Sequence, residues 1–101
     1  MLCLVDSGSL HNRFGRWVAE QVGVDLSGAE VDRIGVGGTV IEAATVTVTL
    51  QLGDFTWDGP VSFCDPWPFD FEILGQLGFL RWFQVVIDAA DESIEITPNR
   101  R

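Results

Sequence analysis

A strict alternation of apolar and polar residues marks the middle of the chain. Residues 45–52 place threonine or glutamine on one side of the predicted strand, and the other side comprises Val46, Val48, Leu50 and Leu52. A two-residue period is typical of a half-buried β-strand. Shorter apolar runs predict further strands at residues 2–5, 31–34, 55–57, 61–64, 71–74, 83–87 and 93–96, with a break at 58–60. The pattern predicts one domain over residues 1–101, in which strands dominate.

Two segments instead carry helical patterns. Asn12 predicts the N-cap of a helix over residues 13–22, and Gly23 predicts its C-terminal end in the left-handed conformation. The apolar face of this helix would comprise Phe14, Trp17, Val18 and Val22. A second, shorter helix is predicted over residues 76–82, directly after Gly75.

Three short motifs lie at the ends of the predicted strands or between them. The apolar run Leu2–Val5 predicts a buried strand that ends on Asp6 and is followed by a Ser-Gly turn. A buried carboxylate without a partner is costly, so an acid at this place favours a functional role. The second motif is the glycine-rich hinge at residues 34–38, and the third is Ile-Leu-Gly at residues 73–75. Each motif alone is typical of an ordinary turn or strand end.

In this order along the chain, Asp-Ser-Gly, Gly-x-Gly-Gly and Ile-Leu-Gly resemble the motifs of the retropepsin-like aspartic proteases, bacterial single-domain members in particular. The resemblance covers nearly the whole chain. It implies an all-β fold, a small closed acid-protease β-barrel with one medium helix after the Asp-Ser-Gly loop and one short C-terminal helix. It also implies an aspartic endopeptidase that acts on a peptide or protein substrate and uses no metal or other cofactor.

Peptide hydrolysis by an aspartic protease needs two neighbouring carboxylates that share one proton. The ionised carboxylate activates water as a general base, and the protonated one donates to the scissile carbonyl oxygen. One Asp-Ser-Gly motif supplies only one carboxylate, whereas a two-fold interface places the same residue of both subunits on the axis. The resemblance therefore implies a homodimer, with Asp6 of each chain in one active site.

The resemblance also assigns roles to the neighbours of the catalytic Asp6. Ser7 would hydrogen-bond across the two-fold axis, and Gly8 would let backbone N–H groups approach the carboxylates. Phe71 and Ile73 match the wall of the family's substrate pocket. The flap that would fold over a bound peptide comprises Gly35, Val36, Gly37 and Gly38. Judged from its glycine content alone, that segment is also consistent with a plain hairpin turn.

One departure from the family bears on activity. The family has a strand before the strand that carries the aspartate, but only Met1–Val5 precede Asp6 in this sequence. We therefore expect the N-terminal strand to be missing or trimmed. Two alternatives stay open. One is a non-catalytic retropepsin-like domain for dimerisation or peptide binding, and the other is a small acidic β-barrel unrelated to proteases, in which the three motifs are turns.

Composition narrows the range of partners. The formal net charge is −9, and the six arginines are scattered apart from Arg100 and Arg101, which predict a disordered tail. Nucleic-acid binding needs clustered basic residues, so it is not expected. No apolar run reaches membrane-spanning length and no signal peptide is recognisable, so no membrane association and a cytoplasmic location are expected. The resemblance adds the expectation of a bacterial source.

Other reactive side chains predict no second centre. Cys3 and Cys64 lie in apolar runs and are expected to be free thiols rather than a disulfide. Ser9 and His11 lie on one loop without an orienting partner, so they do not make a catalytic triad. The acidic residues at 88–92 lack the spacing of a calcium loop and predict a solvated hairpin turn.

Overall fold

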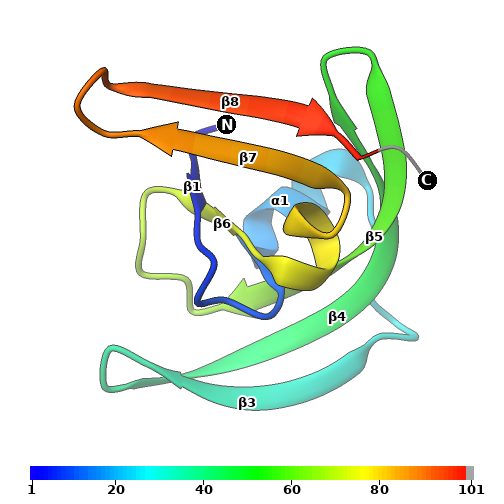
Figure 1. Cartoon of the computed structure of the whole chain (residues 1–101). Helices are drawn as coiled ribbons and strands as arrows, with labels where there is room; N and C mark the ends of the chain where they lie inside the picture. Colours follow the sequence, from blue (N-terminus) through cyan, green and yellow to red (C-terminus); the bar gives the residue numbers. More distant parts are fainter. Residues whose placement is uncertain (100–101) are drawn as a thin grey trace.

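The computed structural model describes residues 1–99, and the predicted tail residues Arg100 and Arg101 lie outside the described part. Strands dominate these residues, as the alternation predicts, and two short helices accompany them (Figure 1). The elements are β1 (Cys3–Val5), β2 (Asn12–Gly15), α1 (Arg16–Val22), β3 (Glu30–Val36), β4 (Thr39–Leu52), β5 (Phe55–Asp65), β6 (Glu72–Leu74), the π-helical turn η1 (Gln76–Leu80), β7 (Phe83–Asp88) and β8 (Ser93–Pro98).

Six strands form one sheet in the order β1-β6-β2-β5-β4-β3, and β7 and β8 form a separate antiparallel hairpin. β6 lies between β1 and β2, parallel to β1 and antiparallel to β2. β2 and β5 are also parallel. Because β6 separates the two N-terminal strands, the loop from β1 to β2 crosses the end of β6. This crossing builds the candidate site.

The expected closed barrel is not found in the strand pairing of residues 1–99, because the sheet ends at β1 on one side and at β3 on the other. β4 has 14 residues but β3 has only 7, so the far half of β4 pairs with β5 alone. At the opposite side, β1 has 3 residues and pairs with β6 only. Figure 1 shows β4 and β5 as a long, curved hairpin that rises beyond the rest of the sheet.

Three apolar clusters hold these elements together. The first packs α1 against β2 and β5, the second lies against the β3–β4 hairpin, and the third attaches η1 and β7 to β5. Val46, Val48 and Leu50 pack against the first cluster, which confirms the alternation predicted for β4. The buried members are Phe14, Val18, Ala19, Val61 and Phe63 in the first cluster, Ile41, Ala43 and Cys64 in the second, and Trp57, Phe79 and Phe83 in the third.

Two strands differ from their predicted form. The segment at residues 2–5 contains a strand, but not a buried one, because β1 lies at the edge of the sheet and leaves Leu4 48% exposed. The predicted break at 58–60 is also wrong, since β5 runs through Pro60 without interruption. β2 pairs with β5 only from Val61 onward, so Pro60 lies where β5 has one neighbour and where a proline is tolerated.

The helix after the Asp-Ser-Gly loop is shorter than predicted. It begins at Arg16 rather than at residue 13, because residues 12–15 pair with β5 as the strand β2. Trp17 and Val22 are exposed, so they do not belong to the buried face of the helix. Gly23 ends the helix with a φ of 77°, as predicted. No helix within the described residues is long and apolar enough to cross a membrane.

Candidate active site

The candidate site begins where β1 ends. β1 runs parallel to β6, with Val5 level with Leu74. One residue further on, the Asp6 N–H donates to the Leu74 carbonyl oxygen at 2.9 Å. The Asp6 side chain is only partly buried. The backbone that carries this carboxylate is therefore fixed to the end of β6, while the side chain still meets solvent.

The turn after β1 holds the carboxylate in place. The Gly8 N–H donates to Asp6 Oδ1 at 2.9 Å, and the Ser9 N–H donates to the Asp6 carbonyl oxygen at 3.1 Å. A backbone N–H is a strong partner for an ionised carboxylate. A Cβ at Gly8 would lie 3.1 Å from Asp6 Oδ1, so a larger residue would crowd that oxygen. Ser7 and Gly8 are exposed, which leaves this side of the turn open to solvent.

The third motif clamps this turn from the other side. The Gln76 N–H donates to the Ser9 carbonyl oxygen and the Leu77 N–H donates to the Leu10 carbonyl oxygen, both at 2.9 Å. The Gln76 side-chain amide adds a hydrogen bond to the Ser7 carbonyl oxygen at 2.8 Å. The segment after the third motif is therefore in direct contact with the loop of the first motif, through two backbone hydrogen bonds and one side-chain hydrogen bond.

Gly75 is the point of closest approach in this clamp. A Cβ at this position would lie 2.6 Å from the Ser9 carbonyl oxygen and would also overlap the His11 carbonyl group. Both obstacles are backbone atoms, which cannot swing aside as a flexible side chain can. Glycine is required here for close approach of two chain segments, rather than for an unusual φ.

Asn12 is a positioning residue that the sequence pattern misassigned. Its side chain is fully buried, and its Oδ1 accepts the Gly75 N–H at 2.9 Å. It does not cap α1, whose N-terminus receives no side-chain hydrogen bond. An asparagine just before a helical pattern is usually a cap. No signal in the sequence indicates that this side chain reaches a glycine 63 positions away.

The two faces of the β1–β6 pair have different surroundings. Cys3 and Leu74 point to one face, where they line an apolar cavity. Successive side chains of a strand alternate between faces, so the level pair Leu4 and Ile73 lies on the opposite face. Asp6, two residues after Leu4, follows the same alternation. The predicted pocket residue Ile73 and the catalytic candidate Asp6 therefore share a face with Leu4. The two-residue spacing between Leu4 and Asp6 in the sequence would have identified Leu4 as their neighbour.

The glycine-rich motif forms the turn of the β3–β4 hairpin. β3 ends at Val36, and Gly37 and Gly38 alone make the turn. Their φ angles are 56° and 80°, and positive values at both positions are typical of a type I′ turn. Gly35 lies within β3. A Cβ would meet nothing within 4 Å at any of the three glycines. The tip is unobstructed, which suits a plain hairpin turn and a flap alike.

An aromatic loop links this hairpin to Phe71. Val36 packs against the second apolar cluster together with Trp67. The Trp67 indole N–H donates to the Phe71 carbonyl oxygen at 3.0 Å, and Phe69 stacks on Phe71 with ring centroids 5.2 Å apart. In the view of Figure 1, the hairpin tip, this loop and the loop after β1 lie at the same end of the molecule. The second motif is thus joined to the predicted pocket residue through Trp67.

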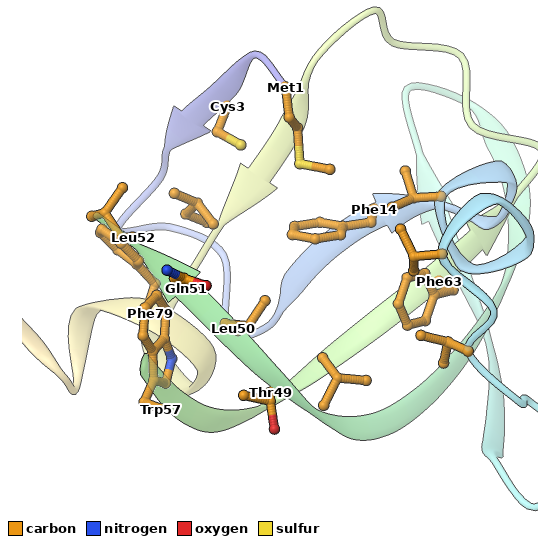
Figure 2. Close-up of a pocket in the computed structure, with 15 residues that line it drawn as sticks. Met1, Cys3, Phe14, Thr49, Leu50, Gln51, Leu52, Trp57, Phe63 and Phe79 are labelled. Carbon is orange, nitrogen blue, oxygen red and sulfur yellow. The ribbon is translucent and has the colours of Figure 1, made fainter. Parts of the chain in front are cut away.

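A large cavity lies away from Asp6. It has a volume of about 500 Å³, is partly open to solvent and is bordered by parts of β1, α1, β4, β5 and β6 (Figure 2). Aromatic rings of Phe14, Phe63, Trp57 and Phe79 surround it, and Cys3 lies at one rim. None of the residues predicted as catalytic, flap or substrate-pocket residues lines it. The cavity belongs to the opposite face of the β1–β6 pair.

Among residues 1–99, the other reactive side chains form neither a catalytic triad nor a group of metal ligands. The Ser9 hydroxyl donates to the His11 carbonyl oxygen at 2.7 Å and is not paired with the imidazole ring. In the same part of the chain, no three histidine, cysteine or acidic side chains are grouped to hold a metal ion. Cys3 and Cys64 are free thiols, as predicted. Burial raises the pKa of both thiols.

Comparison with known proteins bears on the fold. No family model and no curated protein sequence matches the chain. Among solved structures, the chain is similar to a retropepsin-like aspartic protease from Rickettsia conorii, with a TM-score of 0.55 and 24% sequence identity. The match covers 83% of this chain and 64% of that chain, so the chain spans less than two thirds of the length of that protease. The chain therefore has a retropepsin-like, mainly β fold, and identity at this level shows the fold alone.

Proposed function

We propose that the chain is one subunit of a homodimeric aspartic endopeptidase. The observation that carries the proposal is the setting of Asp6, a partly exposed carboxylate fixed through its own N–H to the end of β6 and through the Gly8 N–H to a tight turn. The retropepsin-like fold supports the same function. Such a peptidase needs two carboxylates in one site, and one chain supplies one of them.

In this proposal the second carboxylate comes from a second copy of the chain. A two-fold axis beside Asp6 would bring both Asp6 side chains into one site and Ser7 close to the axis. Leu4 and Leu10 flank the loop and are 48% and 56% exposed. A second subunit at this place would cover apolar surface that is otherwise in water, which favours association.

In the proposed reaction the two Asp6 carboxylates share one proton. The ionised carboxylate takes a proton from the attacking water, and the protonated carboxyl donates to the carbonyl oxygen of the scissile bond. The Gly8 N–H keeps Asp6 Oδ1 oriented during both transfers. The substrate peptide would lie across the face that carries Ile73, against the wall formed by Phe71, with the β3–β4 hairpin closing over it.

The experiment that tests the proposal compares Asp6→Asn with the wild type on an unfolded protein substrate. We expect the substitution to lower the cleavage rate about 10²–10⁴-fold, because it removes the general acid and base. The fold should stay intact, because the side chain is partly exposed. Asp25→Asn is the matched control. Asp25 accepts the N–H of Ser27, two residues ahead, just as Asp6 accepts that of Gly8, but it lies in the loop between α1 and β3.

Sedimentation of the same samples measures the dimer. Equal cleavage by the wild type and Asp6→Asn would show that Asp6 is not catalytic. A dimer that does not cleave would establish the alternative, a non-catalytic retropepsin-like domain for dimerisation or peptide binding. A wild-type protein that is both monomeric and inactive would overturn the proposal.

The flap has its own test at Gly37, where φ is 56°. A valine here must adopt a left-handed conformation, which costs about 1–2 kcal/mol, and we expect turnover to fall more steeply than stability. Gly37→Asn is the control, because asparagine tolerates this conformation. Wild-type turnover in a folded Gly37→Val variant would reduce the segment to a plain turn.

A further inference from the structure

A smaller pocket lies between α1 and the C-terminal end of β5. It has a volume of about 320 Å³, close to the lower limit of ligand pockets, which is about 300 Å³. Two indole rings and three charged side chains line it, those of Trp17, Trp67, Arg16, Glu20 and Asp65. None of the residues assigned to catalysis, the flap or the substrate pocket belongs to its lining. The proposed peptidase therefore gives this pocket no role.

The two indole rings approach the same point beside Gly15. A Cβ at Gly15 would lie 2.5 Å from Trp17 Nε1 and 3.3 Å from Trp67 Cδ1. The φ of Gly15 is −62°, which any residue adopts, so glycine serves close approach here rather than an unusual conformation. A side chain at this position would displace the Trp17 ring. Glycine thus allows the two rings to lie next to each other.

One of these rings is fixed and the other is open to solvent. The Trp67 indole N–H donates to the Phe71 carbonyl oxygen at 3.0 Å, and the ring packs edge-on against Phe69 with centroids 5.1 Å apart. These contacts hold one wall of the pocket in place before a ligand binds, which lowers the entropic cost of binding. Trp17 is 54% exposed, so much of its ring is available to a ligand. Aromatic faces carry partial negative charge and attract cations.

The charged groups around the rings also favour a cation. Glu20 and Asp65 line the pocket, and Arg16 is the basic residue among them. Asp65 is level with Glu42 in the β4–β5 ladder, and like charges directly opposite each other are destabilising. With Arg33, which is level with Glu42 on β3, the group contains three carboxylates and two guanidinium groups. One bound cation would therefore neutralise the group.

We propose that this pocket binds the quaternary ammonium group of a small organic cation between Trp17 and Trp67. Such a group is a typical ligand of aromatic cages, and tryptophan is its best aromatic partner. Glu20 and Asp65 would balance its charge without a hydrogen bond, because a quaternary nitrogen has no N–H to donate. The volume of about 320 Å³ suits a small molecule.

Choline tests this proposal together with its neutral carbon analogue, the alcohol in which a carbon atom replaces the ammonium nitrogen. The two molecules have nearly the same shape, so they differ in charge alone. In an NMR titration of the wild-type protein, we expect choline to shift the indole signals of Trp17 and Trp67 in a saturable manner. The signals of Trp57 and Trp82, which do not line the pocket, should stay in place. The neutral analogue should bind at least about tenfold more weakly.

Two matched substitutions locate the effect of charge. Glu20→Gln removes a carboxylate from the pocket, whereas Glu95→Gln removes an exposed carboxylate from β8. Both change the net charge equally, so we expect only Glu20→Gln to weaken choline binding, by about threefold or more. Arg16→Gln removes a positive charge from the same pocket and should strengthen binding instead. A merely structural role of these side chains would not reverse the effect with the sign of the charge.

Trp17→Leu tests the contribution of the ring. Because Trp17 is exposed, the fold should persist with an apolar side chain in its place. We expect choline binding to weaken about fivefold or more, and Trp17→Phe should restore part of the loss, since a smaller ring keeps part of the cation–π attraction. Binding of the neutral analogue should change less. The comparison of the two ligands in the wild-type protein needs no variant, so it holds even where a substitution impairs folding.

Several results would overturn the proposal. Equal affinity for choline and the neutral analogue would show a pocket for apolar groups, and weaker binding of choline by Arg16→Gln would contradict the assigned charge balance. Shifts that do not saturate, or that sodium chloride at equal concentration reproduces, would show that choline has no site. A peptide with one trimethyllysine that binds more tightly than choline would assign the pocket to a protein side chain instead of a small molecule.

Discussion

Different interactions act on the two faces of the β1–β6 pair. On the face of Asp6, the loop after β1 and the segment after β6 are joined by two backbone hydrogen bonds of 2.9 Å and by a side-chain hydrogen bond of 2.8 Å from Gln76, and Gly75 leaves no room for a further atom. On the other face, apolar side chains surround about 500 Å³ of space. Three-residue strands thus separate a face where chain segments are joined by hydrogen bonds from a face that borders a loosely packed apolar space.

This difference indicates which forces position the candidate carboxylate. The Asp6 loop is fixed by hydrogen bonds whose geometry is narrow, not by side chains pressed against it from the cavity. Filling the cavity should therefore leave the loop in place, while any added atom in the clamp should displace it. The predictions below test this contrast from the largest expected effect to the smallest.

The largest effect is expected for Gly75→Ala. The added Cβ would overlap the His11 carbonyl group and lie 2.6 Å from the Ser9 carbonyl oxygen, so two backbone segments must separate. We expect a loss of about 3 kcal/mol or more in the free energy of unfolding, measured with denaturant. The Asp6 loop should also lose its hydrogen bonds, seen as faster amide exchange at Gln76 and Leu77.

Gly28→Ala is the control for this substitution. Gly28 has open space around its Cβ position and lacks a positive φ. Alanine there should raise the free energy of unfolding by about 0.4–1 kcal/mol, because it lowers the conformational entropy of the unfolded chain. Equal effects at the two positions would show that the clamp is loose, and the contrast between the faces would then be wrong.

A substitution at the cavity should have a smaller effect, and it should raise rather than lower the free energy of unfolding. Val48 lines it and is partly buried, so Val48→Ile adds a methylene group to free space. We expect a gain of about 0.5–1 kcal/mol in the free energy of unfolding, as is usual when a cavity is filled. The amide signals of the Asp6 loop should not move, because the added group lies on the opposite face.

Val61→Ile is the matched control for Val48→Ile. Val61 is fully buried in the first cluster and does not line the cavity. The same methylene group should cost about 1–3 kcal/mol there, because a packed core has no room for it. Destabilisation of similar size by both isoleucines would mean that the cavity closes in solution.

Much of the fold follows from local patterns in the sequence. The alternation over residues 45–52 predicts β4 correctly, because one side of that strand packs on the core and the other meets water. Gly23 is predicted equally well, since its positive φ is a local requirement. Pairing between distant segments is not encoded in this way. The edge position of β1, which exposes Leu4, depends on β6 and is not visible in the sequence around it.

In the candidate site, too, some residues could be predicted from local patterns and others could not. Asp6 and Gly75 stand out as members of short motifs, and the structure brings their two motifs together. Asn12 could not be found, because a buried side chain that bonds a distant backbone N–H looks like a helix cap in the sequence. Leu4 could have been found by extending the two-residue period backward from Asp6. Short motifs therefore indicate the candidate site, whereas the residues that hold it together can be identified only from the tertiary structure.

A smaller effect is expected when the cysteine at the rim of the cavity is compared with the cysteine of the second cluster. Cys3 is partly exposed at the rim of the cavity, whereas Cys64 is 1% exposed in the second cluster. The thiolate of an accessible cysteine attacks iodoacetamide and displaces iodide, so we expect Cys3 to be modified first and Cys64 only after unfolding. Mass spectrometry of partly alkylated protein measures this order. Equal rates would show that the second cluster opens as readily as the cavity.

The same two thiols predict how stability depends on pH. Burial is the main cause that raises the pKa of each thiol above its ordinary value of 9.0. A folded protein that holds a proton more tightly than the unfolded chain is stabilised while the thiol is protonated in both states. This is the case at pH values below 9.0. This contribution is lost as the pH rises through the raised value. Denaturant unfolding at pH values on both sides of 9.0 should therefore show that the free energy of unfolding declines with rising pH, and Cys64→Ala should make this decline shallower. A decline of unchanged slope would mean that Cys64 titrates as freely in the folded protein as in the unfolded chain.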